Sequence, residues 1–134
     1  MIQNTEAIWI ESAGGPGQLK LKTMDLAPLG QDEVLVEMEA AGVAFADIMM
    51  REGRYPGVRL PVTPGYDLIG RVVAVGTHVR GFEIGERVGA LTIFGSYARH
   101  RTLKADRIVT APPDAAPAEL VAMILNYCTA WQMS

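Results

Sequence analysis

The sequence predicts a mainly β protein, a small barrel or sandwich, with one short helix in its middle and one helix near its carboxyl end. Short runs of alternating apolar and polar residues recur at close spacing, as in small antiparallel folds. Clusters of glycine and proline separate these runs and mark turns. Only the last segment, residues 116–134, is rich in the alanine, leucine and methionine that favour helices.

Three strands are expected in the first third of the chain. Residues 5–11 and 19–25 are β-rich runs, and a turn with several glycines and a proline separates them. Residues 33–43 show the clearest alternation. One face of that run carries Val34, Val36 and Met38, and the other mostly carries Glu33, Leu35, Glu37 and Glu39. This pattern predicts a half-buried strand.

The alternation then breaks, and a short helix is expected from Ala46 to about Arg51, ended by Gly53. A loop constrained by its prolines follows. Residues 66–76 form a long β-rich run in which Gly70 suggests a bulge or a bend of a barrel.

Further short strands are expected at residues 85–91, 95–103 and 106–112, each preceded by a turn. The helical segment that follows has apolar residues on nearly every side. A helix of that kind is normally covered on all sides. We therefore expect residues 116–134 to be the first helix of a further, absent part, with residues 1–115 as the β domain.

Composition excludes several classes of protein. The net charge is −3 and the basic residues are scattered, so nucleic acid is not an expected partner. The only cysteine, Cys128, rules out an internal disulfide and any zinc site built on several thiolates, and it fits a reducing, cytoplasmic compartment. No secretory signal is visible, and no apolar run approaches the roughly 20 residues that cross a membrane.

The segment LPVTPGYDLIG, residues 60–70, sets Tyr66 beside Asp67 within a frame of prolines and glycines. Three interpretations are open: a catalytic acid and base, the remains of a metal site, or the ordinary start of a strand. Adjacent residues of a strand face opposite ways. We therefore expect the two side chains to be separated, with Asp67 held by backbone groups or by a basic residue.

Several segments together resemble the amino-terminal part of the medium-chain dehydrogenase/reductase superfamily. The G-x-x-x-x-D step at Gly42–Asp47, the P-G-x-x-x-x-G step at Pro64–Gly70 and the G-x-R-V turn at Gly85–Val88 occur in its order and spacing. The likeness runs from about Glu6 to Gln132. It is strongest to the zinc-free quinone oxidoreductase group, including the branch similar to vesicle amine transport protein. Each step alone is weak, and their combination is specific.

The resemblance implies a GroES-like, partly open β-barrel over residues 1–115, with residues 116–134 leading into an absent nucleotide-binding domain. In the superfamily, the barrel and a Rossmann domain form the two walls of a cleft for the nicotinamide cofactor, which the resemblance suggests is NADPH. No G-x-G-x-x-G follows an expected strand here. The apolar final helix should be buried by a neighbouring copy or be partly disordered, and a homo-oligomer is expected.

Zinc-dependent members hold their metal through cysteine, histidine and glutamate side chains. The matching positions here are Ala44, Tyr66, Asp67 and Leu125. Alanine and leucine carry no donor atom, and a neutral tyrosine is a poor ligand. The resemblance therefore implies a zinc-free protein with no metal-binding residue. His78 and His100 lie far apart along the chain and are expected to be ordinary exposed or hydrogen-bonded histidines.

Without a metal, the resemblance implies that the barrel shapes a pocket over the nicotinamide, which carries the hydride. Tyr66 and Tyr55 are then the candidate catalytic hydrogen-bond donors. The candidate cofactor-binding residues are Phe45, Asn126 and Thr129. Asp47 matches an aspartate that we expect to fix the short helix beside the cleft.

Two positions depart from the zinc-free relatives, which often carry asparagine where Ala44 stands and tyrosine where Met49 stands. The pocket is therefore more apolar, which favours a small hydrophobic carbonyl or quinone substrate, weak activity, or a protein adapted to another role. Two hypotheses follow. The chain is the barrel of a zinc-independent, NADPH-dependent oxidoreductase that reduces quinones or enones by hydride transfer, or it is a non-catalytic binding or assembly module. Alone, it should bind NADPH negligibly and show no turnover.

Overall fold

The computed structural model describes residues 2–124, and seven strands make up most of the regular secondary structure there. The strands are β1 (Asn4–Trp9), β2 (Lys20–Asp25), β3 (Glu33–Ala40), β4 (Asp67–Val75), β5 (Arg87–Leu91), β6 (His100–Lys104) and β7 (Val109–Thr110). The helices are α1 (Phe45–Arg51) and α2 (Pro117–Ala122), with 3₁₀ turns η1 (Pro16–Gln18) and η2 (Ala105–Arg107).

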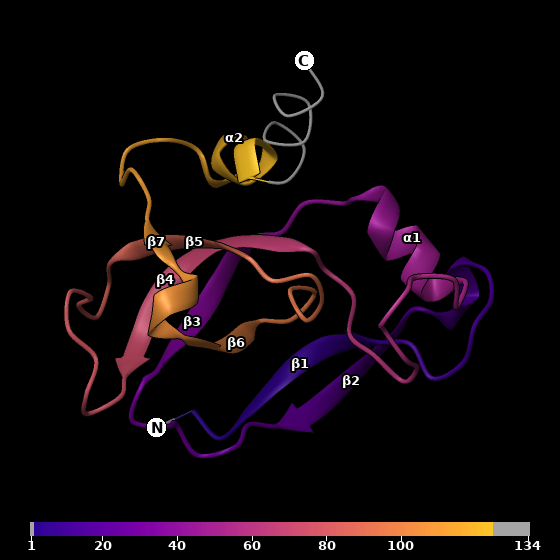
Figure 1. The fold of residues 1–134 in the computed structure, drawn as a ribbon, viewed down its shortest axis with the longest axis horizontal. Coiled ribbons are helices and arrows are strands. Elements are labelled where there is room, and N and C mark those ends of the chain that lie inside the picture. The colour runs from indigo at the N-terminus through magenta and orange to yellow at the C-terminus, as the bar shows by residue number, and fades with distance from the viewer. Residues whose placement is uncertain (1, 125–134) are drawn as a thin grey trace.

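The strands form two antiparallel sheets. β1 and β2 make a hairpin, and the larger sheet has the order β6-β3-β4-β5-β7. Single bridges, Ala7 to Ala98 and Ile10 to Val62, connect the hairpin to the segments before β4 and β6. Figure 1 shows the hairpin beneath the larger sheet, with α2 above it and α1 at one end. The predicted fold class, a partly open GroES-like barrel with few helices, is confirmed.

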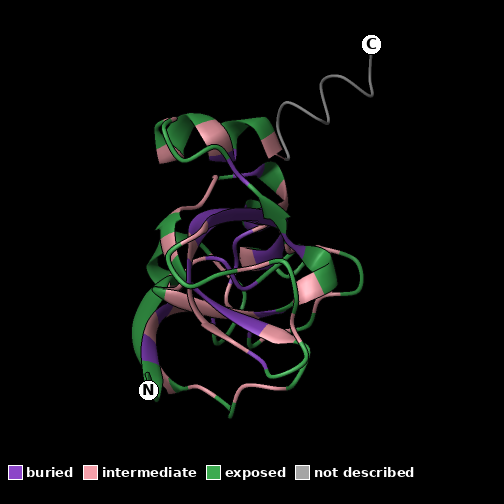
Figure 2. Cartoon of the chain, turned by 90° about the vertical axis from the view of Figure 1, so that its left-hand side faces the viewer, coloured by how far each residue is buried: buried purple, intermediate pink, exposed green. Residues whose placement is uncertain are grey.

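The core lies against the larger sheet, where β3, β4 and β5 contribute fully buried apolar side chains. Its main members are Val34, Val36, Leu68, Val72, Val88, Ala90, Leu103 and Ile108. Figure 2 shows this buried set running through the middle of the molecule, with exposed residues outside it. The alternation predicted for β3 holds for Val34 and Val36 but is wrong for Leu35, which is only 5% exposed. The glutamates on the same face as Leu35 suggested that this face of β3 is exposed to solvent. In the folded chain, the Leu35 position on this face is buried.

The bulge suggested by Gly70 is present in the β3–β4 ladder. The register shifts between Met38 and Ala40, which pair with Gly70 and Ile69. The extra residue thus lies on β3, opposite the glycine. Its lack of a side chain matters there, because a methyl group at Gly70 would collide with the backbone of Glu37.

Two of the strands expected after β5 are shorter than predicted. Residues 95–99 form an irregular segment, and β6 begins only at His100. Residues 105–107 form the turn η2, which leaves β7 with two residues, Val109 and Thr110. β-rich composition alone did not reveal these breaks, because the backbone there bonds to other segments, as in the Tyr97 amide donating to the carbonyl of Pro64.

α2 rests on the larger sheet through one face. Val121 is buried against Ile69 and Ala111, while Met123 is 54% exposed. The prediction of a helix covered on all sides depends on residues 125–134, which lie outside the described residues. No helix within residues 2–124 has the length and apolar character to cross a membrane.

Candidate active site

Asp47 is the centre of a buried hydrogen-bond cluster beside α1. Its carboxylate accepts hydrogen bonds from the Ala44 amide (2.9 Å), the Gly65 amide (3.0 Å) and the Tyr97 hydroxyl (2.9 Å). The first bond caps the start of α1, where backbone amides have no helical partner. The other two fasten α1 to the proline–glycine turn and to the segment before β6. The predicted role of Asp47, fixing the short helix, is confirmed.

The turn before Tyr66 depends on Gly65. Its φ is +118°, and a methyl group there would lie 2.6 Å from the Tyr97 amide nitrogen. Only glycine adopts this conformation without strain at so close an approach. The backbone path from Pro64 into β4 is thereby set, and with it the position from which the Tyr66 side chain starts.

Asp67 points away from its neighbour Tyr66 into the sheet. It is 1% exposed, and its Oδ1 accepts a hydrogen bond from the Gly42 amide at 2.8 Å. The expectation that a backbone group holds Asp67 is confirmed. The acid–base interpretation of the Tyr66–Asp67 pair is not favoured, because the carboxylate is committed to the β3–α1 connection.

Tyr55 and Tyr66, the two tyrosines singled out as catalytic candidates, contact each other. The Tyr55 hydroxyl donates to the Tyr66 oxygen at 3.1 Å, and the rings meet edge to face with centroids 6.2 Å apart. The bond from Tyr55 raises the pKa of Tyr66, and burial and the nearby charge of Asp47 add to the rise. Tyr66 therefore remains a protonated donor at neutral pH and is not a base.

Tyr97 is a member of the cluster that the sequence did not reveal. It lies 50 residues from Asp47 along the chain, so no local spacing connects them. Its hydroxyl also lies 3.4 Å from the Gly42 carbonyl. Burial raises the pKa of Tyr97 above its ordinary range, and the charges of Asp47 and Asp67 raise it further.

The other predicted site residues are less constrained. Phe45 is the first residue of α1, and it is 68% exposed. Asn126 and Thr129 lie outside the described residues. Within residues 2–124, no group of three or more histidine, cysteine, aspartate or glutamate side chains is arranged to hold a metal ion.

An apolar surface surrounds the first turn of α1. Val43, Phe45 and Ile48 are exposed apolar residues on it. A hollow of about 170 Å³ lies beside the helix. Its lining includes Leu19, Val43, Ile48, Pro64 and Tyr97. Such a surface is able to contact an apolar molecule or another protein domain.

Residues 30–113 match the sequence model of the alcohol dehydrogenase GroES-like domain. This match covers more than half of the chain and includes α1, the Gly65 turn, Asp47 and Tyr66. The chain belongs to this family, within the medium-chain dehydrogenase/reductase superfamily. The resemblance inferred from the motifs is therefore confirmed.

Relatives of known name place the domain in context. The quinone oxidoreductase of Lama guanicoe is 39% identical over 110 residues, which are 80% of this chain and 33% of that protein. The human synaptic vesicle membrane protein VAT-1 homolog-like structure superposes with a TM-score of 0.90 at 28% identity, covering 98% of this chain and 43% of that one. A mycobacterial protein complexed with NADPH gives 0.83 at 32% identity, covering 96% and 40%. The chain thus spans about a third of the length of the curated relatives it matches.

The raised pKa of Tyr97 predicts a loss of stability at alkaline pH. The folded pKa lies above the unfolded value of about 10, so the stabilising contribution is complete below that pH and is lost as pH rises above it. Tyr97→Phe should be less stable at pH 7, by about 1–2 kcal/mol, because Asp47 loses a donor. The difference in stability between wild type and Tyr97→Phe, measured by thermal unfolding, should narrow between pH 9 and pH 11. Tyr55→Phe, as a control, should keep the steep alkaline loss, and a gap that stays constant for Tyr97→Phe would contradict the assignment.

Proposed function

We propose that this chain is the barrel of a zinc-independent, NADPH-dependent oxidoreductase that reduces quinones or enones by hydride transfer. The nucleotide-binding domain would be reached through residues 116–134, as predicted from the sequence. The hydrogen-bonded pair Tyr55 and Tyr66 carries this proposal, because it sets a protonated donor beside the helix and turn of the family scaffold. A quinone oxidoreductase and an NADPH complex among the related proteins support it.

The pair is suited to stabilise an oxygen that gains negative charge. Because the Tyr66 oxygen accepts a hydrogen bond from the Tyr55 hydroxyl, the Tyr66 O–H is free to donate a hydrogen bond elsewhere. Hydride addition to an enone or quinone leaves a negative oxygen that needs such a donor. The hydrogen bond from Tyr55 fixes the Tyr66 hydroxyl in place, and the raised pKa of Tyr66 keeps that hydroxyl protonated.

The remaining cofactor contacts are proposed from the family pattern. Phe45 presents an exposed ring with a free apolar face, which fits packing against a flat nicotinamide. Asn126 and Thr129 are proposed to complete the contact. Bound NADPH would supply the hydride, and this chain's part is to shape the substrate pocket and donate the hydrogen bond. Most of the cofactor site would lie beyond residues 1–134, so the chain alone should not turn over substrate.

The proposed substrate is small and apolar. Ala44 is buried and carries no polar side-chain atom, and Val43, Phe45 and Ile48 add exposed apolar area around α1. These surroundings favour a hydrophobic carbonyl or quinone over a sugar or a charged acid.

The test is Tyr66→Phe in the full-length protein that contains this chain. Menadione reduction with NADPH should lose about 100-fold in kcat/KM, the usual effect of removing one donor from a developing oxyanion. Tyr55→Phe should lose less, because it acts through Tyr66. Both variants should unfold at nearly the wild-type denaturant concentration. An unchanged kcat/KM for Tyr66→Phe would reject the assigned role.

The alternative is a non-catalytic binding or assembly module. The exposed apolar surface of α1 favours it, since such a surface can bind a partner as well as a substrate. Full-length protein that binds no NADPH and reduces neither quinones nor enones would support this alternative over the enzyme.

A further inference from the structure

Arg101 is a partly buried cation with no acidic partner in the described part of the chain. It lies on β6, two residues before the core residue Leu103 and therefore on the same side of the strand. Its guanidinium forms no ion pair and no hydrogen bond with any residue from 2 to 124, and its Nε is shielded from solvent. Burial lowers the pKa of Arg101. Its guanidinium also lies over the Phe94 ring, 5.6 Å from the ring centroid.

The neighbouring backbone packs closely around the Arg101 guanidinium. The guanidinium lies against Gly95, where a methyl group would collide with it. An unpaired charge in such surroundings is costly, and proteins normally supply an anion or an acidic side chain. Neither is found within residues 2–124, which points to an anion from outside.

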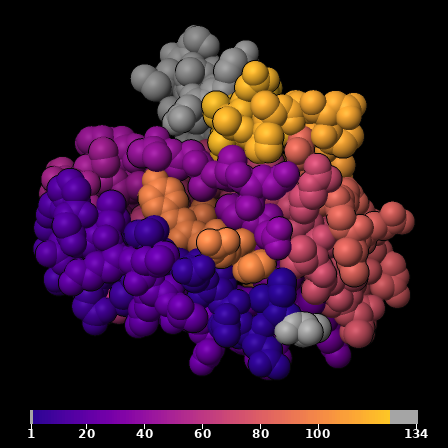
Figure 3. All heavy atoms as spheres, turned by 180° about the vertical axis from the view of Figure 1, so that it is seen from behind, coloured from indigo at the N-terminus to yellow at the C-terminus, as the bar shows by residue number. Residues whose placement is uncertain are grey.

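Arg101 lines a hollow of about 280 Å³ between the hairpin and β6. Neither Tyr55 nor Tyr66 lines this hollow. Figure 3 shows atoms of the segment around β6 between the amino-terminal segments on the back of the molecule. This site is therefore distinct from the proposed active site.

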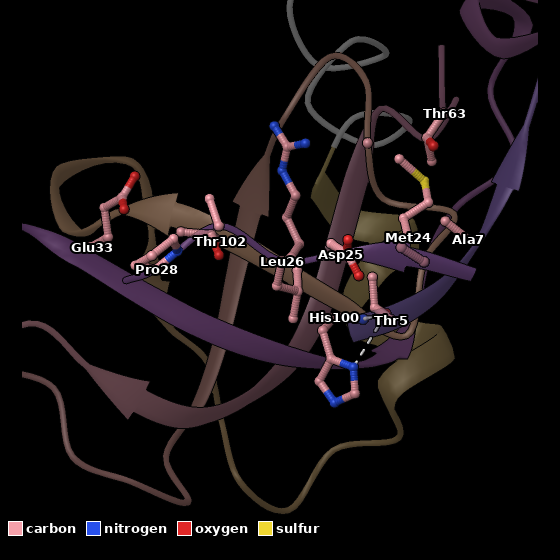
Figure 4. Close-up of a pocket in the computed structure, with 14 residues that line it drawn as sticks. Thr5, Ala7, Met24, Asp25, Leu26, Pro28, Glu33, Thr63, His100 and Thr102 are labelled. Carbon is pink, nitrogen blue, oxygen red and sulfur yellow. Dashed lines mark hydrogen bonds between the residues drawn. The ribbon is translucent and has the colours of Figure 1, made fainter. Parts of the chain in front are cut away.

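The walls of the hollow combine apolar side chains with hydroxyl groups. Ala7, Met24, Leu26, Pro28 and Ala98 supply the apolar part, and Thr5, Thr63 and Thr102 supply the hydroxyls. Figure 4 labels these side chains apart from Ala98, and it shows the hydrogen bond between His100 Nδ1 and the Thr5 hydroxyl, which is 3.2 Å long. An apolar pocket with a few polar groups is the usual form of a small-molecule site.

Two carboxylates also line the hollow, and neither neutralises Arg101. Glu33 accepts a hydrogen bond from the Gly30 amide at 2.7 Å and lies at the far end from Thr5 and His100 in Figure 4. Asp25 is exposed and forms no ion pair with the guanidinium.

Additional positive charge lies on the other side of Arg101. A second hollow of about 260 Å³ shares Arg101 with the first and is also lined by Lys104 and Arg107. Across the two hollows, three cationic side chains face two carboxylates. The local field therefore favours an anion at the guanidinium.

We propose that this hollow binds a small organic acid, with its carboxylate on the Arg101 guanidinium and its apolar body against Ala7, Met24 and Leu26. The planar guanidinium matches a carboxylate through paired hydrogen bonds. The volume is at the low end for ligand pockets, so the acid is small.

Octanoate is the probe for this site, and 1-octanol and acetate are its matched controls. By titration calorimetry with the 134-residue chain, octanoate should bind at least tenfold more tightly than 1-octanol, which lacks the charge, and than acetate, which lacks the apolar body. Equal binding of octanoate and 1-octanol would overturn the role of Arg101. Equal binding of acetate would overturn the apolar part, and no octanoate binding would overturn the proposal.

Arg101→Met separates the ligand effect from folding. Without ligand, this variant should unfold at a higher urea concentration than wild type, because a partly buried charge without a described partner is removed. Its octanoate affinity should fall at least tenfold. Arg99→Met is the matched control. Arg99 lies two residues before Arg101, but its side chain is exposed and forms an ion pair with Glu6 at the surface. It should leave octanoate binding unchanged, and an equal loss in both variants would refute the site.

Discussion

Asp47→Asn is expected to lower the free energy of unfolding by about 3 kcal/mol. The two carboxylate oxygens of Asp47 accept from three donors: the Ala44 and Gly65 amides and the Tyr97 hydroxyl. An asparagine side chain has one acceptor oxygen, and its NH₂ group would face an amide that also donates. In either orientation at least one buried N–H is left without an acceptor, and the remaining bonds lose the help of the negative charge.

Urea denaturation of Asp47→Asn beside Asp106→Asn measures this effect. Asp106→Asn is the same substitution at an exposed position in η2. It should change the free energy of unfolding of the protein by less than about 0.5 kcal/mol. Equal small effects in the two variants would show that the carboxylate does not hold the site together. A large effect confined to Asp47 would also predict that Tyr66, which follows the Gly65 turn, loses its fixed position.

Arg87→Met is expected to destabilise the domain by about 3–4 kcal/mol. The Arg87 side chain is 6% exposed, and its Nε bonds to Glu39 at 3.0 Å. Its Nη1 also donates to the carbonyls of Pro112, Pro113 and Ala115, at 3.1, 3.0 and 2.6 Å. Methionine would fill the space but leave these carbonyls and the carboxylate without their donor.

The matched control is Arg71→Met, in the same ion-pair network. Arg71 contacts Glu39 at 3.5 Å, but its side chain is 40% exposed. Exposed ion pairs contribute little, so this variant should lose less than about 1 kcal/mol. Arg87→Met should also make residues 112–116 more open to protease, because Arg87 ties that segment to β5. Similar urea midpoints for both variants would contradict the special role of Arg87.

Much of the fold followed from local patterns. The bounds of α1 were predicted within one residue, because alternation ends before it and Gly53 follows its last turn. A bulge or a bend was predicted at Gly70, because a glycine inside a strand run often marks one of the two, and the structure has the bulge. The lengths of β6 and β7 were overestimated, since backbone groups there pair with distant segments that a local pattern does not contain.

The candidate site was predicted only in part. Tyr55 and Tyr66 were named from the resemblance, but their mutual hydrogen bond was not. Tyr97 was missed altogether, although it donates to Asp47. The catalytic and cofactor roles assigned to Tyr66, Tyr55 and Phe45 stay predictions. So do those of Asn126 and Thr129.

By itself, the sequence determined the family, the order of the strands along the chain and the separation of Asp67 from Tyr66, because these depend on spacing, alternation and turn residues. Only the tertiary structure decided which groups satisfy the buried carboxylate of Asp47, and that the Nε of Arg101 is shielded from solvent without a described partner. The physical reason is that hydrogen bonding and desolvation are set by what lies within a few ångströms in space. Partners 50 residues apart leave no trace in local sequence.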